Sequence, residues 1–341
     1  MVKKQKPFKI GPVHIAPGET KEIKLLIAKN YDYSNAYMPV KVIRGLADGP
    51  RLFVCAALHG DEVNGVEIIK RILQNKRLKS LTGTLIVVPI VNIFGFNIMN
   101  RYMPDRRDLN RSFPGNKYGS LTSRLAYIFN KEILSNSTHG IDLHTGSRHK
   151  INLPQVRACL KDKTTSFLAH QFDVPVILDA DIINGSLRKI AHKKKIPLLV
   201  FEGGESLRYN EVAIRSGLAG VLSVMQALGM IPKDGKKVKS IKSFMANRNY
   251  WERAPHSGIF ILQVKLGSII KPRDLLGVIS DPLGNANIEI RAKEEGVIIG
   301  HTQLPLVSRG DALFHVAAFE KIRPVGRSIK SFDDRFDYEE R

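Results

Sequence analysis

The sequence has almost no cysteine and no long apolar run. Its two cysteines, Cys55 and Cys159, are too few for a disulfide framework, and Cys55 lies in an apolar segment that favours a small buried thiol. The most apolar segment, residues 85–99, is interrupted by Pro89 and two asparagines, so it falls short of the roughly 18 residues that span a membrane. The lysine-rich start lacks the apolar stretch of a secretory signal. These absences predict a cytoplasmic protein without a membrane partner.

Acidic residues are also scarce relative to basic ones. The chain has 53 lysines and arginines against 32 aspartates and glutamates, which leaves a net charge of +21. Such a charge attracts anions of any size. The lysine clusters at 193–195 and 236–242, however, are not interleaved with the aromatic residues of a base-stacking surface. We therefore expect small anionic molecules as ligands and no nucleic acid.

The first two thirds of the chain follow the pattern of an α/β protein. An apolar run at 52–58 is followed by helical spacing at 63–73 and by a further strand at 84–91. This order predicts parallel strands with a right-handed crossover. Alternating segments within residues 8–45 predict an antiparallel lead-in to the sheet. Further helices are expected at 121–134, 160–171, 188–195 and 212–228, and further strands at 140–144 and 196–201.

The composition changes near residue 236, so the chain is divided into two domains. We predict a catalytic domain over 1–235, a linker rich in lysine and serine over 236–250, an all-β domain over 251–325 and a charged tail over 326–341. The all-β prediction is based on a weak internal repeat of glycine, apolar run, turn and aspartate. The two copies are joined by the hairpin signal DPLGNAN.

Polar residues stand where the predicted strands end. His59 and Glu62 follow the run at 52–58, and His144 closes the strand that contains Asp142. Ligand sites in open α/β sheets lie at such strand ends, and two histidines with a glutamate suit zinc. Asp142 shares a strand face with His144, so it is placed to orient that imidazole. Taken singly, each histidine is also compatible with an ordinary surface position.

Two further groups extend this pattern. Glu202 leaves the strand at 196–201 beside two glycines that permit close approach of a substrate, and Glu205 is a second acidic candidate. The long polar loop at 92–120 follows a parallel strand, which is a common position for functional residues. Its arginines provide planar donors for a carboxylate or an oxyanion, and they are Arg101, Arg106, Arg107 and Arg111.

Four motifs, HGDE, DLNRSFPG, DLHTG and VFEGGE, occur in this order along the chain. Together they resemble the succinylglutamate desuccinylase and aspartoacylase family, which is related to zinc peptidases of the carboxypeptidase A type. The resemblance covers nearly the whole chain. It implies a zinc-carboxypeptidase-like mixed sheet flanked by helices, with a smaller C-terminal all-β barrel of the biotinyl or lipoyl type. Because DPLGNAN contains no lysine, we expect no lipoyl or biotinyl attachment.

The resemblance also implies a role for each matching residue. His59, Glu62 and His144 would hold one zinc ion per chain and leave a position open for water. Glu202 would be the general base toward that water. Asn110 and Arg111 would bind the substrate carboxylate, and Arg101 would stabilise the oxyanion. Arg101 stands farther upstream than the family pattern, so Arg106 and Arg107 stay open for its role, as Glu205 does for that of Glu202.

Together these roles predict that the protein is a zinc-dependent deacylase, which cleaves the amide bond of a small anionic N-acyl amino acid. The alternative within the same chemistry is a metallocarboxypeptidase that removes a C-terminal residue, for example an acidic one, from a peptide or protein. A third hypothesis is a binding or scaffold protein that retains the fold without catalysis. The sequence leaves open the acyl group, the amino acid and whether the chain forms a homo-oligomer.

Overall fold

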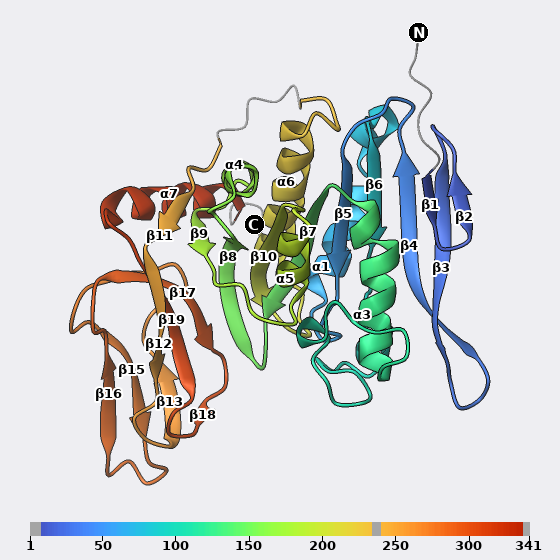
Figure 1. The fold of residues 1–341 in the computed structure, drawn as a ribbon. Coiled ribbons are helices and arrows are strands. Elements are labelled where there is room, and N and C mark those ends of the chain that lie inside the picture. The colour runs from blue at the N-terminus through green and yellow to red at the C-terminus, as the bar shows by residue number, and fades with distance from the viewer. Residues whose placement is uncertain (1–7, 234–239, 337–341) are drawn as a thin grey trace.

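A computed structural model describes residues 8–233 and 240–336, and its centre is a mixed sheet with helices on both faces (Figure 1). The sheet comprises β3 (Thr20–Lys29), β4 (Asn35–Arg44), β5 (Arg51–Ala56), β6 (Thr84–Val88), β7 (His139–Gly146), β8 (Lys150–Ala158), β9 (Val176–Asp179), β10 (Leu198–Glu205), β11 (Phe244–Ala246), β12 (Arg248–Arg253), β14 (Ile269–Ile270), β17 (Gly296–Thr302) and β19 (Ala312–Ala318). The helices are α1 (Asn64–Leu73), α2 (Ile93–Asn97), α3 (Leu121–Glu132), α4 (Lys163–Gln171), α5 (Leu187–Lys193), α6 (Glu211–Ala227) and α7 (Ile322–Phe336). No helix within these residues combines the length and apolar character that a membrane crossing requires.

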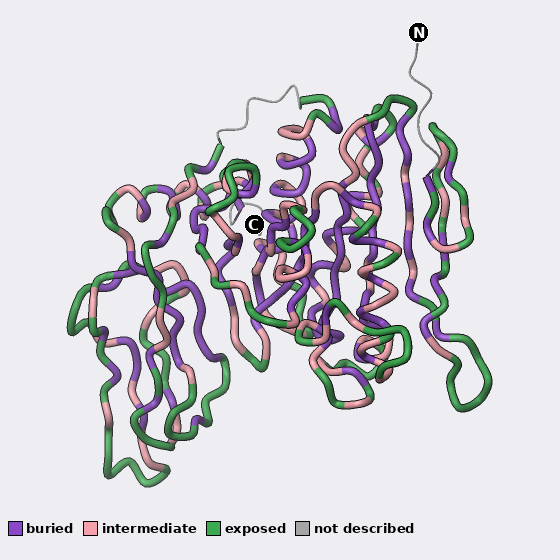
Figure 2. Tube along the Cα trace, in the orientation of Figure 1, coloured by how far each residue is buried: buried purple, intermediate pink, exposed green. Residues whose placement is uncertain are grey.

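The main strand order is β12-β19-β17-β8-β10-β7-β5-β6-β4-β3. The four strands from β10 to β6 run parallel, and β5 and β6 are buried along almost their whole length. Strands covered on both faces are expected to be apolar throughout, which explains why LFVCA and TLIVV lack alternation. Figure 2 shows this central region as the most continuously buried part of the chain.

Two hydrophobic cores lie on opposite faces of the sheet. One contains Ile68 of α1, Phe172 beside α4 and Val221 of α6. The other contains Phe129 of α3 and Leu187 of α5. The parallel strands are thus held between two helical layers, and their C-terminal ends meet at one edge. The predicted helices at 63–73, 121–134, 160–171, 188–195 and 212–228 correspond to α1, α3, α4, α5 and α6.

The predicted antiparallel lead-in is confirmed. Strands β3 and β4 form an antiparallel pair that joins the large sheet through β6, and β1 (Phe8–Ile10) pairs with β2 (Val13–Ile15) in a small sheet. Strands β8 and β9 were not predicted. In β8 the alternation is broken by Pro154, which ordinarily argues against a strand interior.

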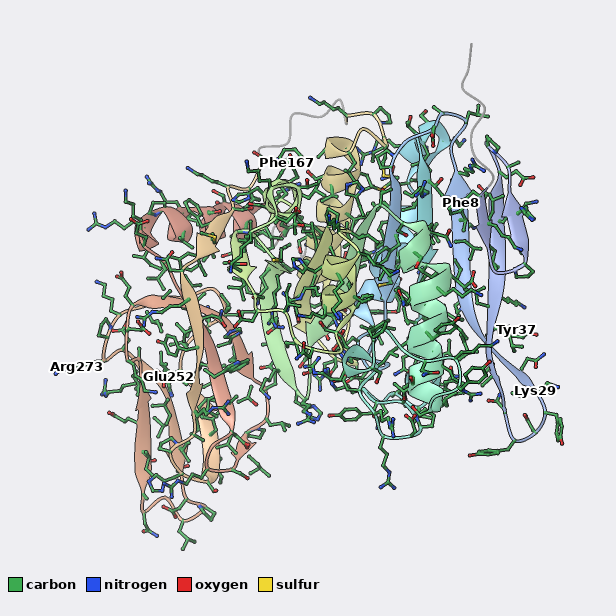
Figure 3. The ribbon with its side chains drawn as sticks, in the orientation of Figure 1. Phe8, Lys29, Tyr37, Phe167, Glu252 and Arg273 are labelled. Atoms are coloured by element: carbon green, nitrogen blue, oxygen red, sulfur yellow. The ribbon has the colours of Figure 1, made fainter. Side chains whose placement is uncertain are left out.

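The C-terminal segment forms two sheets rather than a unit detached from the rest. Strands β12, β19 and β17 continue the large sheet beside β8. The second sheet contains β13 (Gly258–Leu262), β15 (Leu275–Ser280), β16 (Asn287–Arg291) and β18 (Leu306–Val307). A shared core includes Phe260 and Phe314, and Figure 3 shows Glu252 within this unit and Arg273 at its outer side. Mixed α/β architecture is confirmed, whereas a separate barrel with the proposed domain boundaries stays a prediction.

Parts of the predicted linker and of the predicted tail have regular secondary structure. Residues 236–239 of the predicted linker lie outside the described residues, but its later part forms β11, which pairs with β9, and the start of β12. Residues 337–341 of the predicted tail also lie outside, whereas 326–336 belong to α7. The apolar face of α7 reaches the core through Phe332 and Phe336. The tail was predicted because many charged residues lie between the apolar residues of this helix.

Candidate metal centre and active site

The three predicted metal ligands meet at the edge where β5 and β7 end. Nδ1 of His59 lies 2.7 Å from Oε1 of Glu62, and Nδ1 of His144 lies 2.7 Å from Oε2 of the same carboxylate. One ligand atom from each residue can be chosen so that all three lie within 4.8 Å of one another. All three side chains are buried, with at most 5% of each exposed. Strand ends far apart in the chain therefore converge on one point.

The donor chemistry fits zinc. Two imidazole nitrogens and one carboxylate are a frequent ligand set of catalytic zinc, in which one coordination position stays open. The other ring nitrogens are also occupied: Nε2 of His144 lies 2.8 Å from Oδ2 of Asp142, and Nε2 of His59 lies 3.2 Å from Oδ1 of Asp108. Such carboxylate partners fix the tautomer and orientation of metal-binding imidazoles. Asp142 was predicted for this role, whereas Asp108 was missed.

The charges at this centre favour a cation. Burial would lower the pKa of His144, but the negative charges of Asp142 and Glu62 outweigh it and raise that pKa well above its ordinary value. For Glu62 burial acts to raise the pKa, while His59 and His144 together lower it well below the usual range. Three carboxylates thus surround two imidazoles, and positive charge at the centre is stabilised.

Glu202 lies beside the metal centre. Its position on β10 is opposite His144 in the parallel register with β7. Oε2 of Glu202 accepts a hydrogen bond from Nδ2 of Asn152 at 2.9 Å, and Oε1 lies 3.4 Å from Nη1 of Arg157. Glu205 instead lies 3.5 Å from Nε of Arg208 and does not line the cavity that contains Glu202. The geometry thus distinguishes the two acidic candidates.

A cavity of about 210 Å³ joins these groups, and it is lined by every residue to which the resemblance gave a first-choice role. Arg101 reaches it from the loop after β6, with Nη1 at 3.3 Å from Oε1 of Glu62 and Nη2 at 3.1 Å from Oδ2 of Asp108. Neither Arg106 nor Arg107 lines the cavity. Among the three arginines considered for the oxyanion role, Arg101 is therefore the one beside the metal centre.

Asn110 and Arg111 lie in a short helical turn, Leu109–Arg111, on the same loop. Oδ1 of Asn110 accepts a hydrogen bond from the backbone nitrogen of Leu187 at 2.9 Å, which ties the loop to the start of α5. Arg111 donates from Nη1 to the backbone oxygen of Asn110 at 2.7 Å and lines the cavity. Asn110 therefore also holds the loop in place, a contact that the motif did not predict.

Several cavity residues were missed, and they lie on β8, in the first turn of α5 and on β12. They are Lys150, Asn152, Arg157, Arg188 and Trp251. Lys150 and Asn152 occupy even positions of β8, whereas Arg157 is odd, so simple alternation places them on opposite faces. However, β8 has a bulge opposite β10. Asn152 pairs with Gly204 and Gln155 pairs with Glu202, so β8 advances three residues where β10 advances two. The extra residue of this bulge, which contains Pro154, reverses the alternation. Lys150 and Asn152 before the bulge and Arg157 after it therefore all point into the cavity.

Comparison with known proteins supports the family indicated by the motifs. The succinylglutamate desuccinylase/aspartoacylase catalytic domain matches residues 48–228. The N-alpha-acetyl-L-2,4-diaminobutyric acid deacetylase of Halomonas elongata is 25% identical over 312 residues, which cover 86% of this chain and 90% of that protein.

Solved structures show the same fold. The ectoine utilization protein EutE of Ruegeria pomeroyi superposes with a TM-score of 0.78 and 24% identity, over 88% of this chain and 94% of that one. A succinylglutamate desuccinylase/aspartoacylase of Rhodobacter sphaeroides gives a TM-score of 0.78 and 22% identity, over 88% and 95%. Since the matched domain covers more than half of its length, the chain belongs to the succinylglutamate desuccinylase/aspartoacylase family.

Proposed function

We propose that the protein is a zinc-dependent amidohydrolase that releases the acyl group from a small anionic N-acyl amino acid. The observation that carries this proposal is the convergence of His59, Glu62 and His144 beside Glu202 in one cavity. Family membership and the Halomonas relative, which is described as a deacetylase of an N-acetylated amino acid, support it.

His59, Glu62 and His144 would hold one zinc ion per chain. When bound, zinc supplies Lewis-acid chemistry: it polarises a carbonyl group and makes water more acidic. Asp142 and Asp108 would keep the two imidazoles oriented through their hydrogen bonds to Nε2. The ligand set, its burial and its carboxylate partners all agree with a catalytic site.

Glu202 would act as the general base. Its carboxylate would take a proton from the attacking water and later deliver it to the amine nitrogen that leaves. Asn152 and Arg157 hold its two oxygens, so the carboxylate enters the reaction in a defined orientation. Arg101 would donate to the oxyanion, and Asn110 with Arg111 would bind the carboxylate of the amino acid.

The test compares zinc content and turnover across three proteins. We expect about one zinc per wild-type chain, which Glu202→Gln retains and His144→Ala loses. Turnover of N-acyl amino acids should fall about a hundredfold to ten-thousandfold in Glu202→Gln. Glu205→Gln, at the neighbouring acidic residue outside the cavity, is the matched control and should behave as wild type.

The same assay decides among the alternatives. Turnover of free-ended peptides without turnover of N-acyl amino acids would replace the deacylase by the metallocarboxypeptidase. Unaltered turnover in Glu202→Gln would reject this residue as the base. A protein that binds no zinc after reconstitution and turns over neither substrate class would fit the non-catalytic hypothesis.

A further inference from the structure

One buried side chain connects the metal centre to the segment that follows the proposed base. Asn64 lies two residues after the ligand Glu62, at the first position of α1, and only 1% of it is exposed. Its Nδ2 donates to the backbone oxygen of Gly203 at 3.4 Å, and its Oδ1 accepts from the backbone nitrogen of Asn210 at 3.1 Å. Asn64 therefore contacts both ends of segment 203–210, which leads from the proposed base to α6.

Strand pairing alone does not hold the backbone directly after the base. β10 pairs regularly with β7 and β8 up to Glu202, and both registers then shift. Within these described strands, Gly203 is paired with no residue of either neighbour. Buried backbone groups nonetheless require hydrogen-bond partners, and Gly203 is buried. The side chain of Asn64 provides a donor at the position that directly follows Glu202.

Two glycines allow this close approach of the amide. Gly204 has a φ of +73°, and a side chain there would meet Nδ2 of Asn64 at 2.4 Å. A side chain at Gly65 would meet the Cβ atoms of Ala56 and Leu143 at 2.7 and 2.8 Å. The start of α1 therefore packs directly against β5 and β7, and Asn64 projects from a fixed support.

The same segment contacts both metal-binding loops through its backbone. The backbone nitrogen of Ser206 donates to the oxygen of Gly146 at 3.0 Å, and that of Leu207 donates to the oxygen of Asp61 at 2.8 Å. Gly146 lies two residues after one metal ligand, and Asp61 lies between the other two. A displacement of segment 203–210 would therefore change the distance between the proposed base and the metal centre.

We propose that Asn64 is a positioning residue, which fixes the Glu202 carboxylate relative to the metal centre by holding segment 203–210 against α1. The catalytic consequence rests on the proposed function, in which Glu202 must lie within reach of the attacking water. Asn152 and Arg157 orient the two carboxylate oxygens, whereas Asn64 determines where the backbone behind the carboxylate lies. A misplacement of about 1 Å can lower a reaction rate about a hundredfold.

Asn64→Leu tests the inference because leucine branches as asparagine does but neither donates nor accepts a hydrogen bond. Asn64→Ala is the second variant, since it cannot introduce a clash. With an N-acyl amino acid that the wild type turns over, kcat should fall by about tenfold to a hundredfold in both. Zinc content and KM should stay near wild type, because the metal ligands and the residues lining the cavity are unchanged. Asn75→Leu is the matched control, since Asn75 also accepts a backbone N–H, from Arg77 at 3.0 Å, but lies outside the cavity.

Hydrogen exchange of the metal-free protein gives a second readout that does not depend on turnover. The amides of Ser206 and Leu207 bond to backbone oxygens of the metal-binding loops rather than to Asn64. In both Asn64 variants they should exchange about tenfold faster than in wild type, because the segment then opens locally at a lower free-energy cost. The amides of β5 should keep their rates. Asn75→Leu should change neither set of amides.

The two readouts separate failure of the inference from failure of the proposed function. Wild-type kcat in both Asn64 variants, or a raised KM at unchanged kcat, would overturn the inference and leave the deacylase intact. Wild-type exchange at Ser206 and Leu207 would overturn it as well, since Asn64 would then support only the start of α6. Faster exchange in the variants of a chain whose wild type turns over no acyl amino acid would support the positioning of the segment while rejecting the deacylase.

Discussion

The two aspartates behind the metal centre should affect zinc affinity unequally. Asp142→Asn keeps the shape of the side chain but removes the negative charge that faces Nε2 of His144 at 2.8 Å, where both side chains are at most 4% exposed. A buried charged hydrogen bond contributes about 1.5 to 3 kcal/mol, and loss of such partners typically weakens metal binding by about 10- to 100-fold. We expect Asp142→Asn to fall in this range.

Asp108→Asn should cost less. Its contact with Nε2 of His59 is longer, at 3.2 Å, its side chain is 16% exposed, and the same carboxylate also binds Arg101. Water can replace part of a contact at this exposure, so we expect a loss of about tenfold or less. The order of the two variants follows from distance and burial alone.

Competition with a chelator of known zinc affinity measures both effects as dissociation constants. Asp179→Asn is the control, because Asp179 also lies at a strand end, where it accepts a hydrogen bond from the backbone nitrogen of Leu160, but does not line the cavity. Wild-type affinity in Asp142→Asn, or a greater loss in Asp108→Asn than in Asp142→Asn, would refute the reasoning that these carboxylates orient the zinc ligands.

Two further predictions concern stability. Burial, aided by the charge of Arg157, lowers the pKa of His315 from 6.5 to about 3. As pH falls, His315 therefore takes up a proton in the unfolded chain before it does so in the folded chain. The free energy of unfolding decreases between about pH 6.5 and 3, with a limiting slope of ~1.4 kcal/mol per pH unit. His315→Phe should remove that part of the slope in urea unfolding; an unchanged slope contradicts the assignment. Phe332→Ala in α7, where the ring is fully buried, should lower the free energy of unfolding by about 3 to 5 kcal/mol, whereas exposed Lys330→Ala should change it by less than about 0.5 kcal/mol. Equal stability of these two variants would show that α7 is not part of the core.

Local patterns in the sequence were enough to predict the central architecture and the residues at its strand ends. The apolar run at 52–58 and the helical spacing after it correspond to β5 and α1, and these elements place His59 and Glu62 together. A strand end, a turn and the first turn of a helix depend on neighbours only a few residues away. The order of the four motifs then indicated that His144 and Glu202 belong to the same site.

Tertiary structure decided the rest of the cavity. Asn152 reaches Glu202, 50 positions later in the chain, only because β8 pairs with β10 through a bulge that no alternation pattern predicts. Trp251 arrives there through three further strand pairings, and Arg101 is distinguished from Arg106 and Arg107 only by where the loop folds. Helix α7 was expected as a charged tail because charged residues lie between Val325, Ile329, Phe332 and Phe336, although the spacing of these four residues is helical. Sequence spacing determines which way neighbouring side chains point, whereas strand register and packing determine which distant side chains meet.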